Sequence, residues 1–163
     1  MEIHDQSSRH DARISGELVL CDSDAAFRAH RTLFKFGRDR YVICRSSPVT
    51  CLETMKTSSG KLHLACRWKG MLSVTLWRDR IQVGDVLHVL KSVGMSERDL
   101  SPFTGAEIDD LFPALYYGKH FDVLRKVCNH AKKVAEGRLQ SKAIRIDCHL
   151  VAEDSQQIVA SSL

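Results

Sequence analysis

Short segments in which apolar and polar residues alternate, or in which β-branched and aromatic residues gather between turn residues, are typical of β-strands. They predict strands over 14–20, 40–45, 50–55 and 143–151. The last of these alternates most cleanly, as a strand with one buried face does.

Two further segments predict a β-hairpin in the middle of the chain. Residues 62–68 and 72–77 both alternate, and Lys69 with Gly70 between them forms a turn signal. Residues 56–59 have the composition of another turn.

Apolar residues three and four positions apart predict two helices in the first two thirds of the chain. Ser23 or Asp24 is placed to cap a helix over 26–34, and Asp85 is placed to cap one over 86–93, which a glycine ends.

The same spacing predicts the helices that follow. A single helical turn is expected at 96–99, and a helix over 107–115 carries Pro113 at a boundary or a kink. The longest helix, amphipathic and basic on its outer side, is predicted over 120–139.

Together these elements predict an α+β fold. A small mixed or antiparallel sheet with the hairpin at its centre packs against three or four helices, the longest near the C-terminus. Residues 1–13 are expected to form a flexible arm, 14–151 a single domain and 152–163 a flexible tail.

Composition agrees with a folded protein of a reducing compartment. Apolar residues make up 44% of the chain and charged residues 27%. Because residues 1–13 contain no apolar run and the longest apolar run of the chain is short, we expect neither a secretory leader nor a membrane-spanning helix. The six cysteines form no C-x-x-C pair and are expected to be reduced and mostly buried. We expect an intracellular protein, in nucleus or cytoplasm, with no membrane partner.

Charge is spread unevenly. Eight lysines or arginines stand against two acids between 119 and 145, which leaves the rest of the chain slightly negative although its net charge is +4. Such asymmetry favours a surface for nucleic acid or an acidic protein, and a solvated helix face is the alternative.

Two basic groups predict contacts with nucleic-acid phosphates. One repeats at seven-residue spacing on the long helix, and the other surrounds the two tryptophans of the predicted hairpin, which could stack on bases or serve as core anchors. The candidate residues are Arg67, Lys69, Arg78, Arg80, Arg125, Lys126, Lys132 and Lys133.

Catalytic and cofactor motifs are missing from the sequence. It has neither a nucleophile elbow nor a glycine-rich phosphate loop. The Cys/His pairs 63/66, 128/130 and 148/149 lack zinc spacing, and the first pair would point to opposite faces of a strand. We expect no catalytic residue, no metal and no cofactor, although a Cys-His dyad stays open.

Residues 34–100 resemble the N-terminal protrusion region of the second-largest, β-type subunit of multisubunit RNA polymerases. The resemblance rests on a strand, a Ser/Pro segment, a glycine-led strand and a helix in the family's order. The residues that carry it are Phe34, Gly37, Asp39, Arg40, Val42, Ile43, Arg45, Ser46, Pro48, 60–64, Arg80, Ile81, Val83, Val86, Leu87, Leu90 and Gly94. It implies a detached polymerase-subunit fragment with protein partners and no catalytic residue of its own.

Residues 18–34 are similar to the opening of BTB/POZ domains, in which a strand pair leads to the string F-x-A-H-[RK]. Phe27, Ala29, His30 and Arg31 fit that string, and 114–118 is similar to a later Y-x-G element. This similarity implies a protein-interaction adaptor that self-associates.

The leading functional prediction is therefore a non-catalytic binding or assembly module of a transcription complex that contacts nucleic acid. A BTB-like adaptor is the alternative, and a small Cys/His enzyme or zinc protein is the second.

Overall fold

A five-stranded sheet organises the chain, whose computed structural model describes residues 16–55, 60–139 and 144–162. The strand order is β2-β1-β3-β4-β5, and every neighbouring pair is parallel except β4 with β5. The strands are β1 (Glu17–Cys21), β2 (Tyr41–Ile43), β3 (Gly60–Cys66), β4 (Ile144–Ala152) and β5 (Gln157–Ser161). The predicted mixed sheet is thus confirmed.

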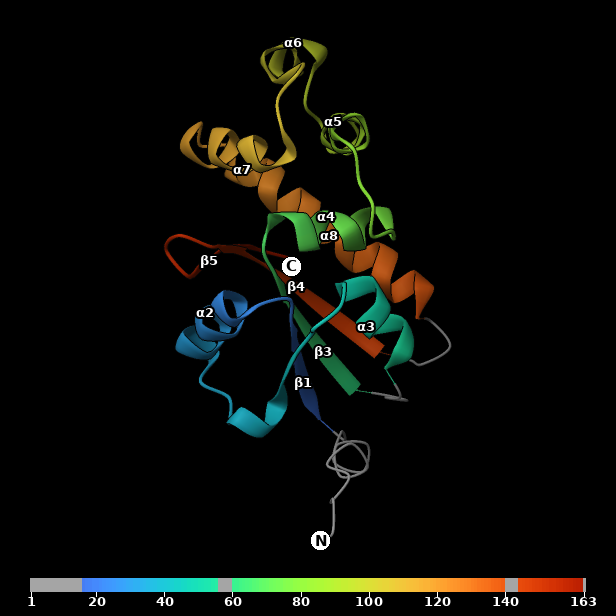
Figure 1. Ribbon diagram of the computed structural model, residues 1–163, viewed down its shortest axis with the longest axis vertical. Helices are drawn as coiled ribbons and strands as arrows, with labels where there is room; N and C mark the ends of the chain where they lie inside the picture. The colour runs from blue at the N-terminus through green and yellow to red at the C-terminus, as the bar shows by residue number, and fades with distance from the viewer. Residues whose placement is uncertain (1–15, 56–59, 140–143, 163) are drawn as a thin grey trace, which may run out of the picture.

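Helices cover both faces of this sheet (Figure 1). On one face α2 (Asp24–Phe34) packs on Val19, Ala65 and Val151. The opposite face carries the larger core, where Leu64, Ile146 and their neighbours meet α3 (Pro48–Thr54), α4 (Trp68–Leu76) and α8 (Phe121–Arg138). A parallel sheet requires this two-sided cover because its connections cross over its faces.

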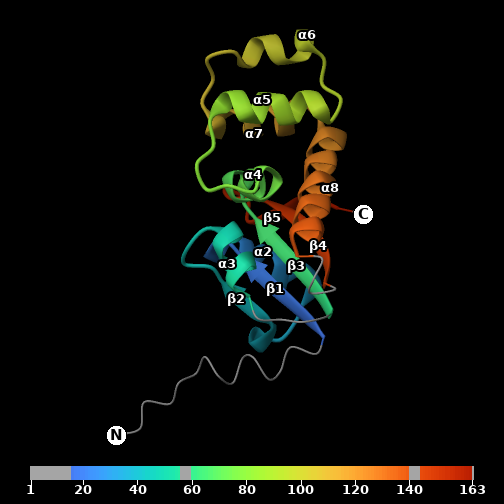
Figure 2. The ribbon, with the colours of Figure 1, turned by 90° about the vertical axis from the view of Figure 1, so that its right-hand side faces the viewer.

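A group of helices extends beyond the carboxyl ends of the strands, above α4 in Figure 2. It contains α5 (Val83–Ser92), the single turn α6 (Glu97–Leu100) and α7 (Ile108–Tyr117), and it packs against α4 and α8. The short helices η1 (Arg38–Arg40) and η2 (Ser101–Phe103) complete the described elements.

Most predicted helices are confirmed, with the caps that their sequences indicate. Ser23 caps α2 by accepting a hydrogen bond from the Ala26 N–H (3.1 Å), and Asp85 completes a capping box with Gln82 at the start of α5. The longest helix, α8, lies where it was expected. Pro113 lies inside α7 rather than at either end.

The prediction of a central hairpin is wrong, because residues 68–76 form helix α4 instead of a turn and a second strand. Met71, Leu72, Ser73, Val74 and Thr75 are all buried between β3 and α8. Apart from the exposed Lys69 and the half-buried Leu76, every residue of α4 is buried. A helix with almost no polar face shows no clear helical period, and the chance alternation of its sequence resembles a strand.

The strand predicted over 50–55 is also wrong, because this segment belongs to α3. Ser47 caps the helix through its hydroxyl, which accepts from the Thr50 N–H (3.1 Å), and Pro48 occupies the first turn. These two residues are a helix-start signal that outweighs the β-branched content.

The C-terminal segment 152–163, expected as a flexible tail, contains β5. It pairs antiparallel with β4, and the Ser162 hydroxyl accepts a hydrogen bond from the Cys148 N–H (2.8 Å). The hairpin of this fold therefore lies at the sheet's edge. The predicted arm 1–13 and the turn 56–59 lie outside the described residues.

Within the described ranges, no helix is long and apolar enough to cross a membrane. The six cysteines are free thiols, and all except Cys51 are buried, which agrees with their expected role as small core residues.

Candidate functional site

The sheet has a topological switch point between β1 and β3. The chain leaves β1 for α2 on one face and leaves the neighbouring β3 for α4 on the other, so the connections diverge at the carboxyl ends of β1 and β3. In open α/β sheets such a divergence leaves a crevice where ligands bind.

Asp22, the residue directly after β1, lies at this point. Its side chain is only 6% exposed, and its carboxylate accepts hydrogen bonds from the Arg67 backbone N–H (3.0 Å) and the Ser23 hydroxyl (2.9 Å). Burial raises the pKa of Asp22, and the hydrogen bond from Ser23 and the charge of Arg67 partly oppose this shift. Gly70 permits the approach, because a Cβ there would collide with the Asp22 carboxylate.

Arg67 joins Asp22 to a neighbouring cavity. Its guanidinium lies 3.7 Å from the Asp22 carboxylate and donates a hydrogen bond to Glu153 (3.0 Å), and both Arg67 and Glu153 line the cavity. Because Arg67 follows β3 and Glu153 follows β4, the cavity opens beside the switch point at the carboxyl ends of both strands.

This cavity has a volume of about 390 Å³, and four of its ten lining residues are aromatic. Trp68 and Phe112 have ring centroids 6.0 Å apart, and Phe112 stacks on Tyr116 at 5.8 Å. Its charged lining residues are one base and three acids. The lining residues are Arg67, Trp68, Asp109, Phe112, Pro113, Tyr116, Tyr117, Val151, Glu153 and Asp154.

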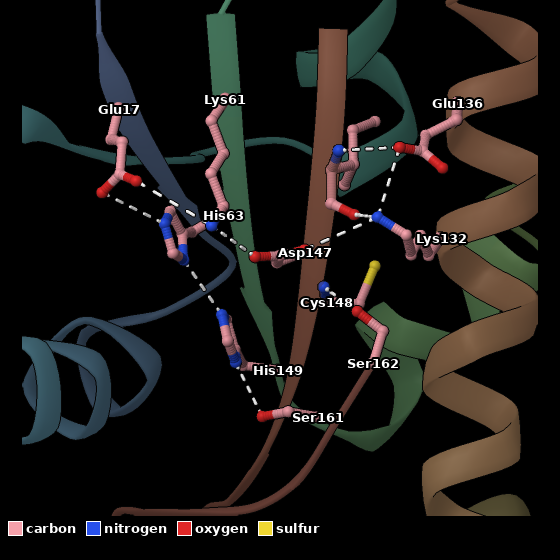
Figure 3. Close-up of polar contacts among 11 residues, drawn as sticks. Glu17, Lys61, His63, Lys132, Glu136, Asp147, Cys148, His149, Ser161 and Ser162 are labelled. Carbon is pink, nitrogen blue, oxygen red and sulfur yellow. Dashed lines mark hydrogen bonds and ion pairs between the residues drawn. The ribbon is translucent and has the colours of Figure 1, made fainter.

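A second cluster lies on the other face of the sheet, where α2 covers β3 and β4. Three buried histidines meet there: His30 from α2, His63 from β3 and His149 from β4. His63 Nδ1 lies 3.0 Å from His149 Nε2, and His149 Nδ1 lies 2.8 Å from the Ser161 hydroxyl of β5, as Figure 3 shows.

Polar and aromatic residues surround these histidines. Glu17 of β1 reaches His63 Nε2 at 3.5 Å, and the Tyr41 hydroxyl lies 2.8 Å from His30 Nδ1. Burial lowers the pKa of His30 to about 3 and that of His149 to about 4, and it lowers the pKa of His63 as well. All three imidazoles are consequently neutral at pH 7.

The predicted basic residues of the hairpin region do not form one free surface. Arg67 pairs with two acids as described above, Lys69 lies 3.2 Å from Asp109, and Arg78 lies 3.7 Å from Asp85. Arg80 is exposed, and no described residue pairs with it.

The predicted basic residues of α8 also fall into two groups, one paired with acids and one exposed without an ion pair to a described residue. Lys132 lies close to Glu136 and Asp147 and donates to the Ile146 carbonyl (2.6 Å). Arg125, Lys126 and Lys133 are exposed and have no ion pair with any described residue. Lys126 and Lys133 line one groove of about 600 Å³ with Asn129, His130 and residues 92–94 at the end of α5.

Both tryptophans serve the structure, in agreement with the core-anchor alternative. Trp68 is buried and its indole N–H donates to the Ile108 carbonyl (3.0 Å), whereas Trp77 ends α4 and lies under the Arg138 guanidinium at 5.9 Å. Trp68 also lines the aromatic cavity described above, and Trp77 is half-buried.

Among the Cys/His pairs of the sequence, His63 and Cys66 lie on opposite faces, as expected. Cys66 belongs to the core under α4, and His63 faces α2. Cys148 and His149 are split in the same way by the strand alternation. The sequence did not predict the histidine cluster or the role of Asp22. A signal existed only for Asp22, which stands between a predicted strand and the cap residue of a predicted helix.

No protein-family model, no curated protein and no solved structure matches this chain. The resemblances to polymerase β-type subunits and to BTB/POZ domains therefore stay predictions.

Proposed function

We propose that this protein is a binding domain that takes a small organic cation into the cavity at the carboxyl ends of β3 and β4. The observation that carries the proposal is the lining of that cavity, in which aromatic faces combine with an excess of carboxylates. Cations bind over aromatic faces because the ring quadrupole is negative there.

The geometry favours an alkylated ammonium group. Trp68, Phe112 and Tyr116 follow one another along a single wall, which gives a cation apolar contact together with an electrostatic attraction. Glu153 and Asp154, in the turn between β4 and β5, add negative charge at the rim. Arg67 pairs with Glu153 and Lys69 pairs with Asp109, so Asp154 is the lining acid that has no ion pair with a described residue.

Choline and its neutral isostere 3,3-dimethylbutan-1-ol test this proposal directly. In a Trp77→Phe variant Trp68 is the only indole, so its fluorescence reports the cavity. We expect saturable quenching by choline and a much weaker response to the isostere. An equal response to both, or no response at millimolar concentrations, overturns the proposal.

Two variants place the ligand within the cavity. Tyr116→Leu removes an aromatic face and should weaken choline binding about tenfold or more, whereas Asp154→Asn removes a rim charge and should weaken it about two- to fivefold. Asp79→Asn is the matched control, because Asp79 is exposed and does not line the cavity. Binding that ignores both cavity changes contradicts the assignment.

A second candidate function, polyanion binding, is favoured by the groove between α5 and α8. Lys126 and Lys133 lie on the same side of α8 with their charges uncompensated by described residues, as a site for backbone phosphates requires. This surface is smaller than the eight predicted residues indicate.

Fluorescence anisotropy of labelled 20-mers, duplex and single-stranded, at 50 and 200 mM salt tests this candidate. Binding should be sequence-independent, fall with salt and weaken when Lys126 and Lys133 are changed to glutamate. Lys35→Glu, at the end of α2, makes the same charge change outside the groove. Absence of binding at 50 mM salt removes this candidate.

A further inference from the structure

Each of the three histidines under α2 has one ring nitrogen near the other two histidines and one that lies farther from them. One ring nitrogen of each lies within 4.8 Å of those of the other two, so that His30, His63 and His149 converge on a common point. They come from positions far apart in the sequence, and the β3–β4 register places His149 beside Ala65, two residues from His63 on the same face.

Two of the imidazoles are hydrogen-bonded from outside by a hydroxyl, and the third has a longer carboxylate contact. The Tyr41 hydroxyl lies 2.8 Å from His30 Nδ1 and the Ser161 hydroxyl lies 2.8 Å from His149 Nδ1. His63 Nε2 makes no hydrogen bond with a described residue, and the Glu17 carboxylate lies 3.5 Å from it. Histidines that bind metals almost always have such a partner on the nitrogen that faces away from the ion, because it fixes the tautomer and the ring orientation.

The inner nitrogens lack comparable partners. Among the residues that the structure describes, His30 Nε2 is buried without a hydrogen-bond partner, and His63 Nδ1 and His149 Nε2 bond only to each other, 3.0 Å apart. A buried polar atom without a partner costs free energy, typically about 1–3 kcal/mol. A bound ion would remove that cost at His30.

The surroundings suit nitrogen ligands. Phe34 has ring centroids 5.4 Å from His63 and 5.1 Å from His149, and Phe36 lies 5.4 Å from His63, so aromatic rings shield the cluster.

We propose that His30, His63 and His149 bind one divalent transition-metal ion, with Zn²⁺ as the ion that best fits three imidazoles. Zn–N bonds of about 2.0–2.1 Å in a tetrahedral site place the ligand nitrogens roughly 3.3 Å apart. His63 Nδ1 and His149 Nε2, now 3.0 Å apart, must therefore separate slightly, and nitrogens spaced up to 4.8 Å apart must approach, which small side-chain rotations can supply. His63 must carry its proton on Nε2, toward Glu17, so that Nδ1 becomes a ligand. Three protein ligands leave the fourth position of a tetrahedral ion to solvent. The site is separate from the cation cavity, and the two proposals stand independently.

Competition with a zinc-binding fluorescent chelator tests the site on the full chain. We expect one Zn²⁺ per chain, and we expect His30→Gln and His149→Gln each to weaken binding at least 100-fold. Ser161→Ala, which removes only an outer partner, should weaken it about 10- to 100-fold. His88→Gln is the control, because His88 is exposed on α5 and outside the cluster.

A second measurement uses the wild-type chain, so it tests the metal site even if a variant fails to fold. Histidine side-chain ¹⁵N NMR spectra of the wild-type chain, recorded before and after one equivalent of Zn²⁺, should show shifts of the ring nitrogens of three histidines. Absence of stoichiometric binding at micromolar Zn²⁺, or binding that shifts only exposed histidines, overturns the proposal and leaves the cluster as a hydrogen-bonded chain from Glu17 to Ser161.

Discussion

Asp22 illustrates how the surroundings of one residue decide its properties. In the sequence it is one acid of the string Cys-Asp-Ser-Asp before a helix. In the structure it is buried beside Arg67, while Asp24, two residues later, begins α2. Its raised pKa follows from burial, which disfavours the charged form more than Ser23 and Arg67 favour it.

This raised pKa makes a prediction about stability. A carboxyl whose pKa is higher in the folded state binds protons more tightly there, so its contribution to stability is full below the unfolded pKa, near 3.8, and is lost as pH rises through the folded pKa. We therefore expect the stability of the wild type relative to Asp22→Asn to decrease as pH rises above about 4 and then to level off.

Urea unfolding of both proteins between pH 4 and pH 7 measures this difference. Asp109→Asn, at an exposed acid near the cavity rim, provides the comparison for a general charge effect. A wild-type advantage that grows with pH would show that Arg67 and the hydrogen bonds outweigh burial.

At the scale of elements, α8 protects an unpaired edge of the sheet. β5 pairs with β4 only from His149 onward, which leaves the first half of β4 without a strand neighbour on that side. Glu136 accepts a hydrogen bond from the Ile146 N–H (3.1 Å), and Lys132 donates to the Ile146 carbonyl (2.6 Å). Two side chains of a helix thus replace the backbone of a missing strand, which prevents edge-to-edge pairing.

Removing this protection should destabilise the protein and expose the edge. Glu136→Ala leaves the Ile146 N–H without its acceptor and removes one of the two carboxylates beside the Lys132 ammonium, which should cost about 1–3 kcal/mol. Chemical denaturation measures the change in free energy of unfolding, and light scattering measures any self-association.

Glu97→Ala is the matched control for this substitution. Glu97 pairs with Lys91 on the exposed surface, where ion pairs are screened by solvent. The edge interpretation fails if both substitutions change stability equally.

At the scale of the whole molecule, β5 connects the sheet to both polar clusters. Its Ser161 contacts His149, the following Ser162 binds the backbone of Cys148, and the turn before it carries Glu153 and Asp154 into the cavity wall. A segment without a strong sequence signal therefore contributes to the sheet, to the histidine cluster and, through the turn before it, to the cavity wall.

Removal of residues 157–163 should consequently destabilise the whole fold, which removal of a disordered tail would not do. We expect the shortened chain to lose cooperative thermal unfolding and near-ultraviolet circular dichroism, because the truncation exposes β4 and removes the partners of two buried groups. If the shortened chain keeps the wild-type melting temperature, β5 does not belong to the cooperative fold.

The sequence by itself determined the elements whose signals are local. The cap Ser23, the capping acid Asp85 and the helical period of α8 predicted helices that the structure confirms, because hydrogen bonds and apolar spacing within a few residues specify them. The same holds for β4, in which buried and exposed residues alternate over Ile144–Cys148.

Only the tertiary structure decided the rest. Residues 68–76 form a helix that the sheet and α8 bury almost completely, a condition that local alternation cannot reveal. Lys132 binds the edge of β4, although its spacing predicted a phosphate contact. His30, His63 and His149 converge because strand order and register bring together positions 33 and 86 residues apart, and no local pattern in a single sequence specifies which strands become neighbours.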